Sequence, residues 1–210
     1  MTERSFIFVS LFKKKMTKAE RTKQFIIEKA APIFNTKGVA GTAMSDIMEA
    51  TKLAKGSMYV HFDSKDELSY AVVDYNLGKL AEKTAAAINK YKTAKGKLFA
   101  FLDFYNDPLN PPLVGGCPML NFGMEADDTN PIIKQKVKKL VQASPQMLAS
   151  IMEQGIIDGE FKKSWNAKEF GIKIFAIIEG GILISRVSGS KEQMGVLIKM
   201  LKKEIEENSI

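Results

Sequence analysis

The residues whose types could do chemistry gather between Gly56 and His61, where a glycine, a small hydroxyl residue, a tyrosine and a histidine stand close together. Their polar groups can donate and accept hydrogen bonds. The chain has one histidine and one cysteine, no paired-carboxylate motif and no cluster with metal-ligand spacing. Metal binding and acid–base or thiol catalysis therefore lack the side chains they need, and we expect no metal and no cofactor. A binding surface is the first interpretation, and a small helical enzyme is a remote alternative.

Two short amphipathic helical patterns separated by a tight turn hold these residues, within residues 38–68. Gly38 should end the preceding helix, because glycine adopts the left-handed cap conformation without steric cost. Thr42 suits the N-cap of a first helix that ends near Ala50. After the turn, a second helix is expected from Lys55 to Phe62.

The second helix should have an inner and an outer face. Met58 and Phe62 are four residues apart and are expected to point inward. The other faces then present to a partner Lys55, Ser57, Tyr59, Val60 and His61. Asp63 or Ser64 should cap the helix that follows. Two short helices joined in this way form a helix-turn-helix arrangement, which predicts DNA binding.

The charge of the chain is concentrated near this segment. The net charge is +7, and between Lys13 and Lys65 there are eleven lysines and arginines but five aspartates and glutamates. A concentrated basic surface attracts phosphate backbones and releases counterions on binding. A solvated basic surface without a partner would show the same excess, but its coincidence with the helix-turn-helix pattern favours DNA.

The segment from Lys55 to Leu68 carries the motif K-G-x-x-Y-x-H-F-x-S-K-x-x-L. With its flanks it resembles the DNA-binding domain of the TetR family of bacterial transcriptional regulators, over about a quarter of the chain. The matching residues are Ile26, Ala30, Ala31, Phe34, Gly38, Thr42, Asp46, Ile47, Leu53, Lys55, Gly56, Tyr59, His61, Phe62, Ser64, Lys65, Glu67 and Leu68. The remainder is similar in length and helical character, with a G-x-x-x-G-x-F turn at residues 155–161 that is common in the family.

The resemblance implies roles for residues of the recognition segment. Phosphate contacts are implied for Thr42, Lys55, Tyr59, His61 and Lys65. Gly56 would let the backbone approach the groove wall, while Ser57 and Val60 would reach base edges.

Two positions depart from the family pattern. Lys52 stands where the family usually has glycine, and Ala54 stands where it usually has serine. Lys52 therefore either adopts a left-handed conformation, which costs about 1 kcal/mol, or occupies a different turn in which it reaches a phosphate.

The second part of the chain is rich in methionine and phenylalanine. An aromatic stripe at helical spacing often forms plain core, but the resemblance implies an apolar effector pocket between helices. The candidate lining residues are Phe99, Phe104, Tyr105, Cys117, Met119, Phe122, Met147, Trp165 and Phe175. Cys117 is interpreted as a buried, inert thiol, with redox sensing as the alternative.

The two last helical patterns, residues 167–187 and 191–206, resemble the family's dimerisation surface. The residues predicted to form the interface are Phe170, Ile174, Ile178, Glu179, Ile182, Leu197 and Leu201. Glu179 is an acid in an apolar stretch, and three roles stay open for it: a polar contact in the interface, ligand binding, or exposure to solvent.

The periodicity predicts an all-α, nine-helix fold without strands. Residues 17–64 should form the helix-turn-helix domain and residues 65–210 an effector-binding and dimerisation domain. Residues 1–16 should be a disordered or mis-annotated arm; packing on the protein, or DNA contact through Lys13 to Lys15, are the alternatives. No apolar run is long enough to span a membrane, and a lone cysteine fits a reducing cytoplasm.

Together these features predict a cytoplasmic homodimeric repressor that binds double-stranded DNA at a palindromic operator and leaves it when a small, largely apolar effector binds. An activator, or a redox-responsive regulator acting through Cys117, are the alternatives.

Overall fold

The computed structural model describes residues 16–210, so the expectations for the first fifteen, including a DNA contact through Lys13 to Lys15, lie outside the described residues. The described part is all-α and contains nine helices and no strand, which confirms the predicted fold class. The helices are α1 Lys18–Gly41, α2 Met44–Thr51, α3 Lys55–Tyr59, α4 Lys65–Ile88, α5 Ala94–Phe104, α6 Pro118–Ala126, α7 Pro131–Ile157, α8 Ala167–Ser188 and α9 Glu192–Glu207.

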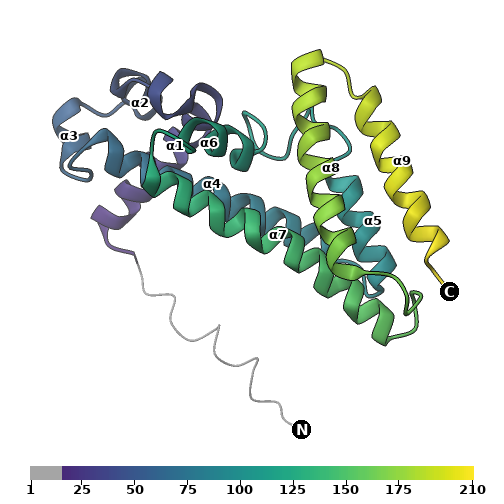
Figure 1. The fold of residues 1–210 in the computed structure, drawn as a ribbon. Helices are drawn as coiled ribbons and strands as arrows, with labels where there is room; N and C mark the ends of the chain where they lie inside the picture. The colour runs from purple at the N-terminus through teal and green to yellow at the C-terminus, as the bar shows by residue number, and fades with distance from the viewer. Residues whose placement is uncertain (1–15) are drawn as a thin grey trace, which may run out of the picture.

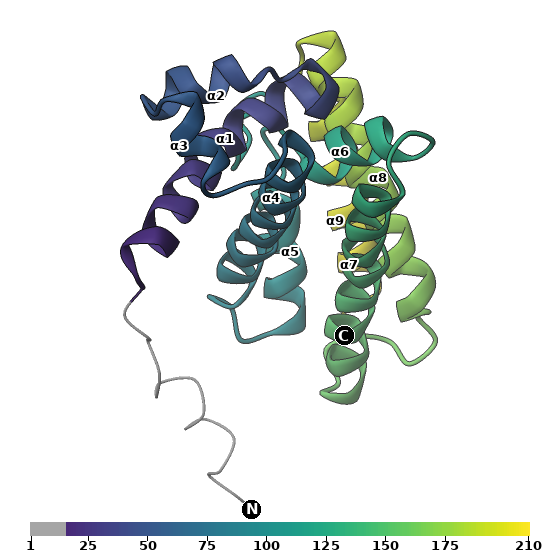
Figure 2. The same ribbon diagram turned by 90° about the vertical axis from the view of Figure 1, so that its left-hand side faces the viewer.

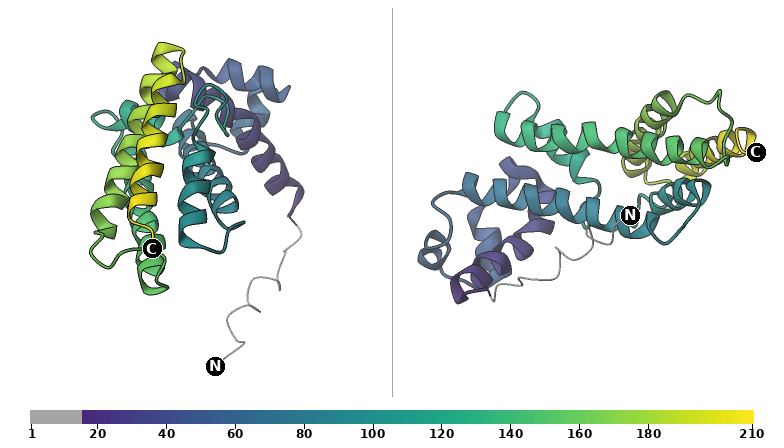
Figure 3. Two further views of the ribbon diagram at one scale, coloured as in Figure 1. Left: turned by 90° about the vertical axis from the view of Figure 1, so that its right-hand side faces the viewer. Right: turned by 90° about the horizontal axis from the view of Figure 1, so that it is seen from below.

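The helices form a small head and a larger body (Figure 1). The head consists of α1, α2 and α3, and α4 runs from it along the length of the molecule (Figure 1). Seen from the head, α6 lies beside the end of α1 and next to α7 (Figure 2). The last two helices, α8 and α9, lie side by side and antiparallel at the far end (Figure 3). The division at residue 64 stays a prediction, since α4 packs on both parts.

Local signals in the sequence fix where several helices begin and end. Thr17 and Glu20 form a capping box at the start of α1. Ser64, one of the two predicted caps, accepts the Glu67 N–H at the start of α4. The chain leaves helical geometry at Gly38, where φ is +75°, so the predicted break is confirmed although the helical hydrogen-bonding pattern resumes as far as Gly41.

The expected N-cap role of Thr42 is wrong. Its hydroxyl donates to the carbonyl of Gly38 at 2.6 Å, so it faces back into α1. Ala43 takes the N-cap position of α2, and its backbone N–H is held instead by the Asp46 carboxylate at 3.0 Å. Helix α3 was expected to reach Phe62, but it ends at Tyr59. After it, the N–H groups of His61 and Phe62 both donate to the Met58 carbonyl and form a tight turn.

Candidate DNA-binding surface and effector cavity

The turn between α2 and α3 is built around Thr51 and Lys52. Lys52 adopts φ +57° and ψ +24°, a left-handed conformation, and it is the one non-glycine residue with positive φ among residues 16–210. The buried Thr51 hydroxyl donates to the Ile47 carbonyl at 2.7 Å and receives the Leu53 N–H at 3.3 Å. These contacts hold the lysine in a strained conformation that glycine would adopt freely, and its exposed side chain extends from the tip of the turn.

The short helix α3 has one face buried in the head and the opposite face exposed. Met58 and Phe62 are buried in the head, as predicted. On the opposite side Val60 is 79% exposed and Tyr59 40% exposed. Lys55 and Gly56 are exposed as well, while Ser57 and His61 are half-buried. A short helix held on one face by two apolar anchors thus offers a cation, a phenol and an apolar side chain to a partner.

Two of the residues implied as phosphate contacts are less accessible than the exposed residues of α3. Thr42 is 1% exposed and its hydroxyl is used within the head. Lys65 is half-buried, and its ammonium lies 3.5 Å from the carbonyl of Ala40. Of the residues implied to contact DNA, those exposed in this conformation are Lys52, Lys55, Gly56, Tyr59 and Val60, and the contacts themselves stay predictions.

The head is joined to the body through α6. The Glu125 carboxylate on α6 accepts the backbone N–H groups of Val39 at 2.7 Å and Ala40 at 2.6 Å, at the end of α1. The Asn121 side chain, one turn earlier, donates to the backbone carbonyl of Asn35 at 2.8 Å. These hydrogen bonds tie the segment that precedes α2 to one helix of the body.

A second joint lies just before α6. The buried Asn35 side chain donates to the carbonyls of Val114 at 2.7 Å and Gly116 at 3.0 Å. Gly115 approaches α1 so closely that a Cβ atom added there would lie 2.7 Å from the Asn35 carbonyl. The loop that leads into α6 is therefore pressed against the head.

A cavity of about 110 Å³ lies in the body between α4, α5, α6, α7 and α8. Its walls are largely apolar, and they are formed by Leu80, Ala81, Thr84, Phe101, Tyr105, Met119, Leu140, Ala143, Ser144, Met147, Phe175 and Glu179. A smaller adjoining cavity of about 20 Å³ shares Leu80 and Tyr105 and also touches Phe104 and Cys117. Within residues 16–210, no group of three or more histidine, cysteine, aspartate or glutamate residues could hold a metal ion.

Two family profiles match this chain. Residues 26–72 match the family described as "Bacterial regulatory proteins, tetR family", and residues 94–201, about half of the chain, match "Tetracyclin repressor-like, C-terminal domain". The chain belongs to the TetR family. It is a transcriptional regulator with a helix-turn-helix DNA-binding domain, as the resemblance implied.

Solved TetR-family structures share both the fold and the sequence. A regulator from Cytophaga hutchinsonii is 36% identical, with 94% of this chain and 99% of that chain covered and a TM-score of 0.87. A regulator from Chloroflexus aurantiacus is 35% identical, with 92% and 98% covered and a TM-score of 0.86. Among curated proteins, the transcriptional repressor DhaR of Mycobacterium sp. (strain GP1) is 21% identical over 82% of this chain and 86% of its own length.

The cavity of this TetR-family regulator contains only part of the predicted lining. Four predicted residues line it, namely Tyr105, Met119, Met147 and Phe175, and the adjoining cavity takes Phe104 and Cys117. Three predicted residues lie elsewhere. Trp165 stacks between Phe161 and Phe170, Phe99 lies beneath Lys95 and Lys202, and Phe122 faces the head near Val39.

Seven of the twelve residues of the cavity wall were not among the predicted site residues. Leu80 and Thr84 on α4 and Leu140 and Ser144 on α7 each face the cavity with a spacing of four residues. This spacing marks the inward face of each helix, but it does not show which helices enclose an empty space. Phe101 on α5 also belongs to this wall and was not among the predicted lining residues.

Glu179, which was assigned first to the dimer interface, faces the cavity. Burial raises the pKa of its carboxyl group to about 7. Its Oε1 atom accepts the Cys117 thiol at 3.6 Å, and its Oε2 atom is buried without a partner among the described residues. Of the three roles left open by the sequence, exposure to solvent is wrong.

Cys117 has the environment of an inert thiol. It is buried, and burial together with the neighbouring Glu179 raises the pKa of the thiol above its usual range. Because the thiolate is the reactive form, this environment disfavours redox sensing.

Most of the residues predicted to form the interface are buried within the protomer, and their role in a dimer stays a prediction. The side chains that are at most 4% exposed are Phe170, Ile174, Ile178, Ile182 and Leu201, and Leu197 is half-buried. The apolar side chains that α8 exposes lie on another stripe, at Ile172, Leu183, Ile184 and Val187. The neighbouring α9 exposes Val196 and Met200. One apolar stripe of α8 thus packs on the body, and a second one is exposed.

Proposed function

We propose that this TetR-family regulator is a homodimeric repressor that binds a palindromic operator and releases it when a small, largely apolar molecule enters the body cavity. The observation that carries the proposal is that one helix, α6, contacts both the cavity and the head. Met119 lines the cavity from the first turn of α6, and Glu125, near the other end of the same helix, holds the end of α1. A ligand that displaces α6 would therefore move the segment that leads into α2 and α3.

The exposed apolar stripe on α8 supports the homodimer. Ile172, Ala176, Leu183 and Val187 repeat at helical spacing, and Val187 is 81% exposed. An exposed apolar row on two adjacent helices is typical of a surface that a partner covers. Two-fold symmetry would then place two α3 helices on successive turns of the major groove.

An effector can shift the DNA-binding equilibrium only by its different affinity for the two conformations. The hydrogen bonds of Asn35, Asn121 and Glu125 link head and body in the conformation seen here. We infer a cytoplasmic location, because a bacterial transcription regulator acts on the chromosome. Within residues 16–210, no helix is long and apolar enough to cross a membrane.

The test is a fluorescence-anisotropy titration of the full chain against duplex DNA from upstream of its own gene, with a shuffled duplex as control. The expected result is tighter binding to the upstream DNA, with two chains per site by analytical ultracentrifugation and weaker binding as salt rises. Equal affinity for both duplexes, or one chain per site, would contradict the proposal.

A further inference from the structure

The body cavity combines apolar walls with one acid whose charge is not balanced. Three aromatic side chains contribute to the wall, namely Phe101, Tyr105 and Phe175. The other lining residues are aliphatic or sulfur-containing, apart from the hydroxyl groups of Thr84 and Ser144. These hydroxyl groups already have partners. Thr84 shares a hydrogen bond with Tyr105 at 2.9 Å, and Ser144 donates to its own helix at 2.9 Å. The polar group of this cavity that lacks a partner is the Oε2 atom of the Glu179 carboxylate.

The cavity lining contains no lysine, arginine or histidine, and no cation of the described chain contributes to the pKa shift of Glu179. Arg186, on the same helix, lies against Gly116. The titratable groups that face Glu179 are the Cys117 thiol at the start of α6 and the Tyr105 phenol on α5. Burial raises the pKa of both, so they stay neutral. The residues of α4 and α7 at the cavity are uncharged. The Oε2 atom of Glu179 therefore lies buried without a counter-charge from the described residues.

A buried carboxylate in such a place is unfavourable unless it binds a proton or a cation. Burial accordingly raises the pKa of Glu179 to about 7. A ligand cation would remove this penalty and pair with Oε2 through a charge-assisted hydrogen bond or close ionic contact. The surrounding aromatic rings favour the same charge, since a cation is attracted to the face of an aromatic ring.

We propose that the effector is a small organic cation, an amine in protonated or alkylated form carried on an apolar body, with its charge at Glu179. This rests on the proposed ligand-responsive function and names the class of ligand. A metal ion would find one carboxylate and too few other oxygen ligands. An anion would be repelled, and an uncharged apolar ligand would leave the carboxylate desolvated without a partner.

The size and the access of the cavity agree with such a ligand. A volume of about 110 Å³ exceeds what one water molecule needs and accommodates a small organic group. Ala81 on α4 and Ala143 on α7 line the cavity but are exposed, so small side chains mark its opening. An open groove along α4 and α7 shares these two alanines. Its charged residues are Asp74, which pairs with Lys136 at 2.6 Å, and Lys139. The groove gives a ligand access to the cavity, and the preference for a cation comes from Glu179 alone.

The position of Glu179 also connects the ligand to the head. Its carboxylate accepts the thiol of Cys117, which is the N-cap residue of α6. A cation that draws Oε1 and Oε2 toward itself competes with this contact. The first residue affected is thus the one at which α6 begins, and α6 holds the end of α1 through Glu125.

The test compares matched ligands on the full-length protein by isothermal titration calorimetry. The cations are benzylammonium, n-butylammonium and tetramethylammonium. The neutral analogues are benzyl alcohol and n-butanol, and benzoate is the anion. We expect at least one cation to bind the wild-type protein more tightly than its neutral analogue by roughly tenfold or more, the ratio that a hydrogen bond to a charged group supplies. Benzoate should bind most weakly.

The variant that isolates the charge is Glu179→Gln, which keeps the shape of the side chain. It should lose the preference for the cation, so that cation and neutral analogue bind within about twofold of each other. Glu179→Asp keeps the charge and should retain the preference at lower affinity. The matched control is Glu153→Gln on α7, an exposed carboxylate without an ion pair in the described part of the chain, and it should bind like the wild type. Circular dichroism of each variant checks that the fold is intact.

The pH dependence provides a readout that a structural role would not give. Protons compete with the cation for Glu179, so the affinity for tetramethylammonium, which itself cannot titrate, should fall by roughly tenfold between about pH 8 and about pH 6. The same titration should be flat in Glu179→Gln.

Three outcomes would overturn the inference: failure of every ammonium probe to bind the wild-type protein, equal or tighter binding of the neutral analogues or of benzoate, or an undiminished preference for the cation in Glu179→Gln. Operator binding is measured separately without ligand, so that the repressor function and the class of ligand are tested independently. If a neutral compound released the operator, the repressor function would be supported and a cationic effector would be excluded.

Discussion

Glu125 and Val39 are 86 residues apart in the sequence, and a hydrogen bond of 2.7 Å joins the carboxylate of one to the backbone N–H of the other. The second oxygen of Glu125 accepts the N–H of Ala40 at 2.6 Å. These donors follow Gly38, where α1 breaks, so they have no partner within a regular helix. The carboxylate of a body helix thus completes the end of a head helix.

Replacing Glu125 by alanine should lower the free energy of unfolding by about 1–3 kcal/mol, because two backbone donors lose a charged acceptor at a partly buried position. Chemical denaturation followed by circular dichroism measures the change. Glu49→Ala is the matched control, since this glutamate is exposed on α2, and its effect should stay within about 0.5 kcal/mol. Equal effects of the two substitutions would show that the α6 contact does not stabilise the head.

Alanine substitutions at Gly115 and Gly159 should distinguish the stability cost of backbone strain from the cost of close packing. Both glycines have positive φ, +93° and +77°. A Cβ atom on Gly115 would lie 2.7 Å from the backbone of Asn35, whereas one on Gly159 would meet nothing within 4 Å. Gly159→Ala should therefore cost only the strain of a left-handed residue, about 1 kcal/mol. Gly115→Ala should cost a further 1–3 kcal/mol or so, because the loop must move away from α1. Thermal unfolding of both variants measures the difference, and equal losses would contradict the close approach.

Local rules account for what the sequence predicted correctly. The break at Gly38 follows from the conformational freedom of glycine, and the cap at Ser64, one of the two predicted caps, follows from its side-chain acceptor. For Lys52 the sequence left two conformations open, and the structure has the left-handed one. The inward positions of Met58 and Phe62 follow from a spacing of four residues. These signals lie within a few residues of the feature that they determine.

The features that the sequence did not predict depend on how distant segments meet. Nothing near Asn121 or Glu125 indicates that they pair with the end of α1, because no local rule selects a partner so far along the chain. On α8 the apolar residues are numerous enough to form two stripes, and the sequence does not show that Ile178 lies on the buried stripe and Leu183 on the exposed one. The cavity was only partly predicted for the same reason, since a helical pattern gives the inner face of a helix but not a void between helices.

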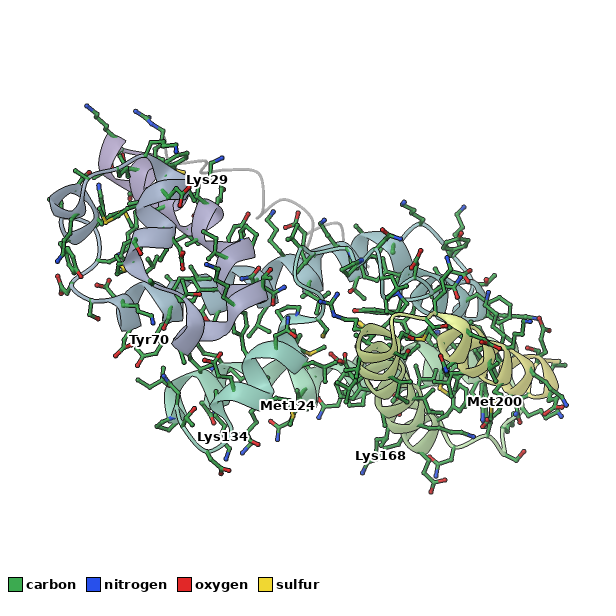
Figure 4. All side chains as sticks on the ribbon, turned by 90° about the horizontal axis from the view of Figure 1, so that it is seen from above. Lys29, Tyr70, Met124, Lys134, Lys168 and Met200 are labelled. Carbon is green, nitrogen blue, oxygen red and sulfur yellow. The ribbon has the colours of Figure 1, made fainter. Side chains whose placement is uncertain are left out.

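Lys55 should contribute one phosphate contact. If it does, Lys55→Ala lowers the slope of log affinity against log salt concentration by about one, since one fewer counterion is released on binding. Lys168→Ala is the control. This lysine is exposed on α8, on the opposite side of the molecule from the head that carries Lys29 (Figure 4). Fluorescence anisotropy at several salt concentrations gives both slopes. A slope that is unchanged in Lys55→Ala would remove this residue from the contact surface.

The exposed stripe of α8 should be the contact between two copies. Leu183 and Val187 are 55% and 81% exposed and four residues apart. A double substitution of both by glutamate places four like charges across a two-fold interface and should give monomers by analytical ultracentrifugation. Operator affinity should fall with it, because one recognition helix reads only half of the site. Ile132→Glu, on the first turn of α7, is the control and should leave the oligomeric state unchanged. A double variant that sediments like the wild type would exclude this face.

Glu179 should make the stability of the ligand-free protein depend on pH. The folded pKa of about 7 lies above the ordinary value of 4.5, so the unfolded chain ionises first as the pH rises. Below about pH 4.5 both states hold the proton, and Glu179 contributes no penalty. Between about pH 4.5 and about pH 7 the folded state loses stability, by an amount on the order of 3 kcal/mol once both states are ionised. Glu179→Gln cannot ionise, so its advantage over the wild-type protein in urea denaturation should grow from about pH 5 to about pH 8. An advantage that stays constant over this range would show that the carboxylate is ionised already at pH 5, and that some contact of the folded protein stabilises its charge.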